Sequence, residues 1–241
     1  MSASFKTSRT HPETIPNSDI FAGARRRAMP EFSWEARVKK PQTVAKLTEL
    51  GRVQLSRTFF MRDFLYSDIA EIHGLSNIPD DPDLAIAAGT RLCEDLLEPL
   101  QDVFGRIAIR SAYRSAEVNR LGNAKGYNCA SNERSAAGHI WDLRDAQGQM
   151  GATACIVVPR FANEWTGPDD WKRIAWWVHD HLPYSTMEFF PVRWAFNLQW
   201  HEKPLRMIYS HIPDARGYLT KSGMPEHDAD HREWWEPIVP R

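Results

Sequence analysis

The spacing of apolar residues along the chain changes near residue 105. Before this point, apolar residues recur every three or four positions, and this spacing predicts helices over 41–55, 59–73 and 84–104. Gly74 and Gly105 follow the second and third of these segments, where a glycine commonly ends a helix. We therefore expect the first part of the domain to be helical.

Beyond residue 105, apolar and polar residues alternate in several short segments, a pattern typical of strands. The predicted strands are 106–110, 139–143, 154–158, 186–190 and 194–201. A helix predicted over 171–181 interrupts this series, and Pro183 ends it. Because helices come first and most strands follow, the order of elements indicates an α+β fold.

The strand predicted over 194–201 alternates most regularly, so its two faces should differ in polarity. The apolar face is expected to carry Trp194, Phe196, Leu198 and Trp200. The opposite face is expected to carry Ala195, Asn197, Gln199 and His201.

Three regions of the chain differ in composition. Residues 1–40 lack a sustained period and carry the basic clusters Arg25–Arg27 and Lys39–Lys40, so we expect a basic arm that is either solvated or in contact with nucleic acid. Residues 41–212 hold the predicted helices and strands and form the domain. Residues 213–241 are rich in charge and proline, and we expect a tail that lies on the domain surface.

The overall charge is almost balanced. The 241 residues include 30 Lys and Arg against 31 Asp and Glu, which gives a formal net charge of -1. This balance argues against a dedicated nucleic-acid or anionic-membrane binder, and no apolar run is long enough to span a membrane. The first residues are polar and show no signal segment, so we expect residence in the cytoplasm.

The chain contains three cysteines and ten tryptophans. The cysteines, Cys93, Cys129 and Cys155, have no metal-like spacing, so we expect reduced, buried thiols. The tryptophans include the pairs Trp176-Trp177 and Trp234-Trp235. The first pair is expected in the core, whereas the second is either core or a stacking surface.

Polar residues interrupt the predicted strands at three places. Arg114 follows a strand end, where it is suited either to bind a carboxylate with two hydrogen bonds or to cap backbone carbonyls. Asp142 and His201 lie in apolar surroundings and need partners if they are buried. A shared metal ion and a plain Asp-His hydrogen bond are the two alternatives.

A series of motifs runs through residues 67–201. It comprises His73-Gly74-Leu75-Ser76-Asn77, Ser111-Ala112-Tyr113-Arg114-Ser115, Gly138-His139-Ile140-Trp141-Asp142, Leu182-Pro183-Tyr184-Ser185 with Glu188, and Trp200-His201. In order and approximate spacing, this series resembles the zinc D,D-carboxypeptidases and endopeptidases of peptidoglycan, including phage-type cell-wall peptidases, which share the hedgehog/DD-peptidase fold.

The resemblance implies a small antiparallel sheet flanked by helices. It also implies a zinc ion held by two histidines and an aspartate, and an arginine that holds the substrate carboxylate. On this chain, the implied arginine is Arg114. Ser111, Tyr113 and Trp200 are the further substrate-binding candidates, and the implied ligand is a peptide or peptidoglycan fragment with a free carboxylate.

The metal positions of the family fall on different residue types in this chain. Gly138 and Asp142 match the family pattern, which puts Ser135 where the first zinc histidine belongs. His139 is the nearest replacement, but on a strand over 138–143 it would face away from Asp142. The expected metal ligands are therefore Asp142 and His201, with His139 as the candidate third ligand.

The catalytic carboxylate is also displaced. Leu198 occupies the position where the family carries its glutamate, and Glu188 is the alternative candidate, either as the catalytic base or as a salt-bridge residue. Because zinc hydrolysis needs both a metal-bound water and a base, we expect impaired or lost activity and a role in binding or structure. The alternative is an active zinc peptidase with a rearranged ligand set. A phage particle or release by lysis would suit this branch of the family.

The predicted tail holds two histidines four residues apart, His227 and His231, with Asp228 and Asp230 between them. On a helix, these two rings would share one face. We expect at most incidental metal binding there.

Overall fold

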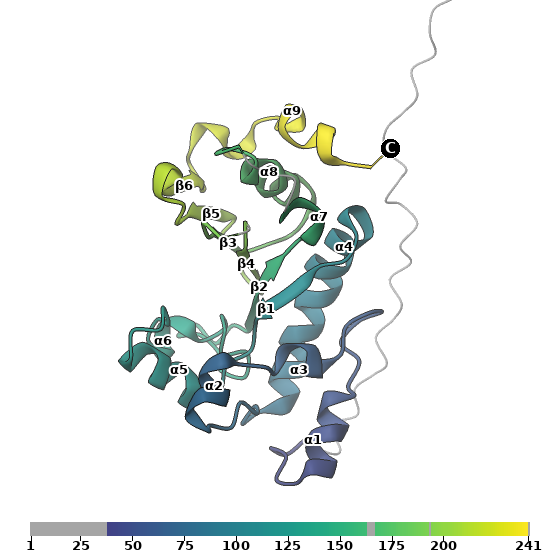
Figure 1. Cartoon of the computed structure of the whole chain (residues 1–241), viewed down its shortest axis with the longest axis vertical. Helices are drawn as coiled ribbons and strands as arrows, with labels where there is room; N and C mark the ends of the chain where they lie inside the picture. The colour runs from purple at the N-terminus through teal and green to yellow at the C-terminus, as the bar shows by residue number, and fades with distance from the viewer. Residues whose placement is uncertain (1–37, 163–166, 193, 241) are drawn as a thin grey trace, which may run out of the picture. The chain divides into compact units, whose positions relative to one another are not determined.

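The computed structural model describes residues 38–162, 167–192 and 194–240. These residues confirm the α+β class and contain one six-stranded sheet with helices around it (Figure 1). The order across the sheet is β1-β2-β4-β3-β5-β6, and every neighbouring pair is antiparallel except β3 and β5. The strands are β1 (Ala108–Ser111), β2 (Gly151–Val157), β3 (Thr186–Phe189), β4 (Phe196–His201), β5 (Met207–Ser210) and β6 (Gly217–Thr220).

The helices fall into α-helices and shorter 3-10 or π segments. The α-helices are α1 (Val44–Gly51), α2 (Asp68–His73), α3 (Pro82–Leu92), α4 (Glu98–Phe104), α5 (Ala116–Ala124), α6 (Asn132–Ser135), α7 (Pro159–Ala162), α8 (Trp171–His181) and α9 (Arg232–Trp235). The shorter segments are η1 (Met61–Phe64), η2 (Cys93–Leu97), η3 (Pro213–Ala215), η4 (Pro225–Asp228) and η5 (Glu236–Ile238). Within the described residues, no helix is sufficiently long and apolar to cross a bilayer.

The long helix predicted over 84–104 is present, but its middle is a π-helical turn, η2, between α3 and α4. Pro99 lies in the first turn of α4. Because proline has no backbone N–H and its ring clashes with the carbonyl four residues earlier, the regular hydrogen-bond pattern cannot pass through it. The wider π turn carries the helix past this position.

The helix predicted over 59–73 is instead two short segments, η1 and α2. Ser67 begins α2 as its N-cap, where the side-chain hydroxyl accepts a hydrogen bond from the backbone N–H of Ala70 (3.4 Å). Gly74 ends α2 with a left-handed φ of 62°, as expected for a glycine in this position. The local capping signals therefore outweigh the longer apolar period.

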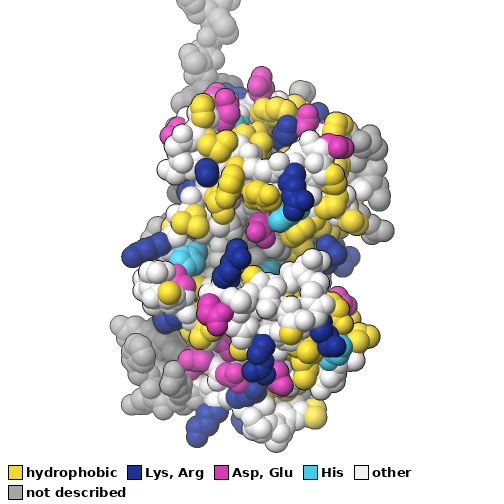
Figure 2. All heavy atoms as spheres, turned by 90° about the vertical axis from the view of Figure 1, so that its left-hand side faces the viewer, with side chains coloured by type: hydrophobic (Ala, Val, Ile, Leu, Met, Phe, Trp, Pro, Cys, Tyr) yellow, Lys and Arg dark blue, Asp and Glu magenta, His cyan; other side chains and the backbone are white. Residues whose placement is uncertain are grey.

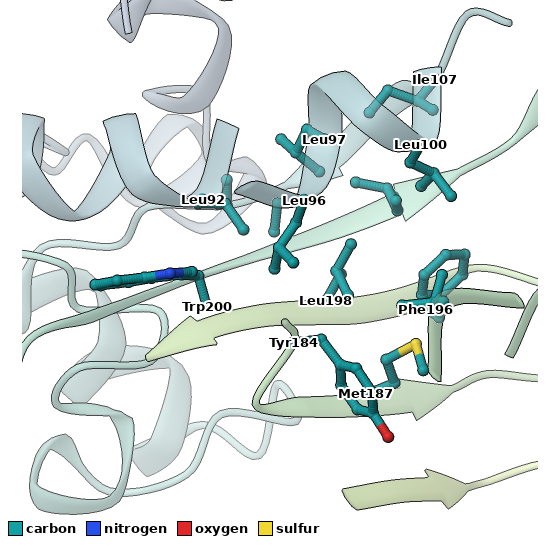
Figure 3. Close-up of a cluster of buried hydrophobic side chains, with 14 of the residues drawn as sticks. Leu92, Leu96, Leu97, Leu100, Ile107, Tyr184, Met187, Phe196, Leu198 and Trp200 are labelled. Atoms are coloured by element: carbon teal, nitrogen blue, oxygen red, sulfur yellow. The ribbon is translucent and has the colours of Figure 1, made fainter. Parts of the chain in front are cut away.

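The main core lies between one face of the sheet and the helices α3, η2, α4 and α8. α3 contacts β2 and β4, and η2 contacts β4. Figure 3 shows side chains of this helical run directed toward those of β4, which confirms the predicted apolar face at Phe196, Leu198 and Trp200. Trp194, also predicted on this face, lies before the strand with a left-handed φ of 50°. The labelled residues from these elements are Leu92, Leu96, Leu97, Leu100, Phe196, Leu198 and Trp200, all of them buried.

The prediction of a strand over 139–143 was wrong. These residues form turns, with a single bridge between Ala136 and Ile140. Ala137 has a left-handed φ of 52°, and the amides of Gly138 and Ile140 both donate to the carbonyl of Ser135, so the backbone cannot be extended here. The argument that His139 and Asp142 lie on opposite faces of a strand therefore no longer applies.

The segment 213–241 is more than a surface tail. Its strand β6 forms the last strand of the sheet, paired with β5. Of the predicted basic arm, residues 1–37 lie outside the described part of the chain. All three cysteines are buried and unbridged, and Trp176 and Trp177 are both buried, as predicted.

The two tail histidines do not share a helical face, because η4 and α9 are separate segments. The His231 ring stacks on Trp176 at 3.7 Å between centroids and places Nδ1 2.8 Å from Asp180 Oδ1. His227 instead places Nδ1 3.1 Å from the hydroxyl of Thr220. The His231 ring and the His227 ring, which also lies 5.0 Å from the His179 ring centroid, pack the C-terminal segment against α8.

Candidate functional site

Strand register aligns six residues in one transverse row on the sheet face opposite the main helical core. Cys155 pairs with Ser111 on one side and with Asn197 on the other, and Asn197 pairs with Glu188. Glu188 continues the row through β5 to the edge strand β6. The complete row is Ser111, Cys155, Asn197, Glu188, Tyr209 and Tyr218.

A loop covers only part of this face. The segment after α6 lies over β2 and β4, where Gln199 Nε2 donates to the carbonyl of Ala137 (2.9 Å) and the Thr153 amide donates to the carbonyl of Gly138 (3.0 Å). Figure 2 views this side of the molecule and shows a depression across its middle. We call it the central depression; it lies between the part that holds α5 and α6 and the part that holds β5 and β6.

Arg114 follows β1 and enters this region, as the sequence predicted. Its backbone amide donates to the carbonyl of His139 (2.8 Å), which ties the end of β1 to the covering loop. Its Nη1 donates to Cys129 Sγ (2.6 Å), and its Nε is buried and has no hydrogen-bond partner within the described ranges. Burial lowers the pKa of the guanidinium, although Cys129 and Cys155 act in the opposite direction.

No carboxylate among the described residues lies within ion-pair distance of Arg114. The backbone-capping alternative also has no support there, because the hydrogen bond of the side chain goes to the thiol of Cys129. A half-buried cation without a counter-ion is costly. Arg114 therefore has no counter-ion among the described residues.

His139 lies beside Arg114 and is neutral. Its Nδ1 is 2.8 Å from the carbonyl oxygen of Ala112, which can only accept, so Nδ1 carries the proton. Burial and the nearby Arg114 charge lower the pKa of the ring to about 3, while hydrogen bonds with Ala112 and Asn197 partly oppose this. A neutral imidazole therefore stands next to the buried guanidinium at any pH above about 4.

The Asn197 side-chain amide links Glu188 to His139, which lies beside Arg114. Asn197 Nδ2 donates to Glu188 Oε2 (2.8 Å), and the Asn197 side chain also hydrogen-bonds His139. Cys155 completes the group on the β2 side, where burial raises the pKa of its thiol and a hydrogen bond from Arg110 opposes the shift. The sequence analysis did not single out Asn197 or Cys155, although the alternation of β4 had placed Asn197 on the polar face.

Asp142 and Tyr113 form a separate contact away from this row. The Asp142 carboxylate accepts hydrogen bonds from the amides of Asp80 (2.7 Å) and Asp81 (3.4 Å) and from the Tyr113 hydroxyl (3.1 Å). Burial raises the pKa of the carboxyl group, and these hydrogen bonds act against the shift. Tyr113 is fully buried, and its hydroxyl holds Asp142 against the start of α3 rather than lying open to a ligand.

His201 has its own partner as well. Its Nε2 lies 3.2 Å from Asp145 Oδ2, and Asp145 also accepts hydrogen bonds from the amides of Gln147 and Gln149 in the following turn. Trp200, the neighbouring residue, points to the opposite face of β4 and is buried against the helices, with Arg91 5.4 Å from its ring centroid. Trp200 therefore lies in the core on the helix side of β4, on the opposite face from His201.

The residues at the family's metal positions do not fit a zinc site. The Asp142 and His201 side chains are engaged in different hydrogen-bond groups, as described above. Ser135 is buried, and its hydroxyl lies 3.5 Å from the carbonyl oxygen of Ala130. His139 directs its protonated nitrogen at a backbone carbonyl. Across the described ranges, no three His, Cys, Asp or Glu side chains form a group that could hold a metal ion, and we derive no reaction step through zinc.

Leu198, at the family's position for the catalytic glutamate, is fully buried on the helix side of β4. Glu188 lies on the opposite face, in the central row. The two positions are therefore not equivalent in space. A carboxylate placed at 198 would enter the core rather than the central depression.

Comparison with known proteins adds no relative. No family model matches the sequence, and searches of the curated proteins and of the solved structures return no significant match.

Proposed function

We propose that this protein is a binding domain on a DD-peptidase-like fold, which holds the free carboxylate of a peptide or peptidoglycan fragment through Arg114. The observation that carries this proposal is the state of the Arg114 side chain. It is a half-buried cation with a thiol as its hydrogen-bond partner, an unsatisfied Nε and no carboxylate partner among the described residues.

A ligand carboxylate would supply the missing charge. Guanidinium groups bind carboxylates by two parallel N–H···O bonds, and these bonds strengthen where water is excluded. Among the neighbouring side chains, His139 is neutral and Glu188 is held by the Asn197 amide, so Arg114 is the group that would attract an anion. The neighbouring amide, imidazole and carboxylate offer both donors and acceptors to the peptide groups of such a ligand.

The side chains at the implied metal and base positions support a binding role without zinc hydrolysis. The family's metal positions are engaged elsewhere, and Leu198 stands in the core where a base would be needed. Of the residues that the resemblance implies for the site, Arg114 is the one whose surroundings support its implied role.

The test is calorimetry with two forms of one peptide, an acetylated Lys-D-Ala-D-Ala with a free carboxylate and the same peptide with a C-terminal amide. The free acid should bind, and the amide should bind at least about tenfold more weakly, which corresponds to about 1.4 kcal/mol. Arg114→Lys keeps the charge but loses the planar fork, so it should weaken the free acid by a similar factor.

Arg91→Lys is the matched control, because Arg91 lies on α3, where it pairs with Asp95 (2.7 Å), and packs over the ring of Trp200 on the helix side of the sheet. Its affinity for the free acid should equal that of the parent. Equal affinity for acid and amide, or an Arg114→Lys variant that binds as the parent does, would show that Arg114 is structural.

A further inference from the structure

The central row continues into a group of aromatic residues. Tyr209 on β5 pairs with Glu188 on β3 and with Tyr218 on β6, so the three side chains share one face of the sheet. Phe190 and His211 lie two residues beyond Glu188 and Tyr209, and their rings stack at 5.3 Å with an interplanar angle of 5°. We call Phe190, Tyr209, His211 and Tyr218 the aromatic shelf.

The four rings form a continuous surface. Tyr209 contacts His211 at 4.9 Å and Tyr218 at 5.2 Å between centroids, both edge to face. Tyr218 is 47% exposed, and the other three residues are half-buried. Lys221 Nζ lies 4.3 Å from the Tyr218 ring centroid at the outer end. The shelf is thus accessible, and it borders Glu188 at its inner end.

The polar atoms of the shelf have no hydrogen-bond partner among the residues that the structure describes. Within the described residues, the hydroxyls of Tyr209 and Tyr218 and the ring nitrogens of His211 make no hydrogen bond to another side chain or to the backbone, in contrast to the buried Tyr113, Tyr184 and His179. A purely apolar partner would cover these atoms and leave them unsatisfied. The shelf therefore suits a ligand with both apolar faces and hydroxyl groups.

We propose that the aromatic shelf binds a neutral sugar ring. The apolar C–H face of a pyranose would pack on the tyrosine rings, and its hydroxyls would hydrogen-bond to His211, the tyrosine hydroxyls and Glu188. A nucleic acid fits less well, because its phosphates would lie beside the Glu188 carboxylate.

The shelf does not depend on Arg114, but the two positions can serve one ligand. Arg114 follows β1, and β1 and β6 are separated by five strand spacings, about 24 Å in total, so a glycopeptide with a free carboxylate must span most of the sheet to reach both. This extension to a single glycopeptide rests on the proposed carboxylate-binding function. The sugar-binding proposal stands without it.

The test uses saturation-transfer NMR and titration with chitotriose and cellotriose, which carry no carboxylate. Ring protons of at least one sugar should receive saturation, and Tyr218→Ala should weaken its binding by about tenfold. Tyr66→Ala is the matched control, because Tyr66 is an exposed tyrosine outside the sheet whose hydroxyl bonds Asp68. It should bind the sugar as the parent does.

Two further ligands test whether the shelf instead binds nucleic acid or protein. They are a short pyrimidine oligonucleotide and an amidated peptide that contains tyrosine. Absence of sugar binding at millimolar concentration, equal binding by parent and Tyr218→Ala, or preferential binding of either further ligand would overturn the proposal. Because the free-acid peptide is measured separately, sugar binding without carboxylate binding would refute only the Arg114 function, and the reverse result would refute only the shelf.

Discussion

Replacing Arg114 with methionine separates a functional from a structural role for this residue. Methionine has a similar length and no charge, so it fills much of the same space without the need for a counter-ion. If Arg114 is kept for a ligand, the unliganded protein should become more stable when the charge is removed.

The size of the effect follows from two opposing contributions. The variant loses the hydrogen bond from Nη1 to Cys129, worth about 0.5–1.5 kcal/mol. The variant also removes the unsatisfied Nε–H, whose burial costs the parent about 1–3 kcal/mol. It further removes the cost of burying an unpaired charge. The second contribution is larger, so Arg114→Met should raise the free energy of unfolding by about 1–2 kcal/mol.

A ligand should reverse this order. At a free-acid peptide concentration of about 100 times Kd, the parent gains about 2.7 kcal/mol and the variant gains nothing. Urea unfolding with and without the peptide measures both effects, and Arg91→Met, on the other side of the sheet, should respond to the peptide as the parent does. An unliganded Arg114→Met variant that is less stable than the parent by more than about 1 kcal/mol would refute the reasoning.

Two further predictions concern the groups around the depression. Tyr113→Phe removes one of the hydrogen bonds that hold the buried Asp142 carboxylate, so it should cost about 1–2 kcal/mol in urea unfolding, and an unchanged midpoint would contradict this role. Because the pKa of His139 is lowered from 6.5 to about 3 on folding, its neutral form stabilises the protein above pH 6.5, and this contribution is lost as pH falls toward 3. Between pH 7 and pH 5, the free energy of unfolding of the parent should fall by about 2 kcal/mol from this group. His139→Asn, whose amide can still donate to Ala112, should not show this loss. Equal pH dependence in both proteins would refute the prediction.

Local periodicity explains which elements the sequence analysis predicted correctly. The helix 171–181 and the alternating faces of the strand near 194–201 follow directly from the spacing of their own residues. The turn at 139–143 was misread because Ile140 and Trp141 are buried by tertiary packing, with the Trp141 indole donating to the carbonyl of Thr153 (3.1 Å). Apolar residues in a covered loop and in a strand look alike in sequence.

The candidate site was predictable only in part. Arg114 was found because its position past a strand is a local feature. The row from Ser111 to Tyr218 depends on strand register, and register is set by contacts between segments far apart in the chain. Trp200 was misplaced for a different reason: adjacency to His201 suggested a common cleft, whereas adjacent residues of one strand face opposite sides.

The most direct test of the Arg114 function is the NMR signal of its own Nε–H group. This proton has no acceptor among the described residues, so it should be sensitive to a carboxylate that binds the guanidinium. Titration with the free-acid peptide should shift the signal in a saturable way, and the amide form of the same peptide should not. A signal that does not respond to the free acid, or that responds equally to both forms, would contradict the account.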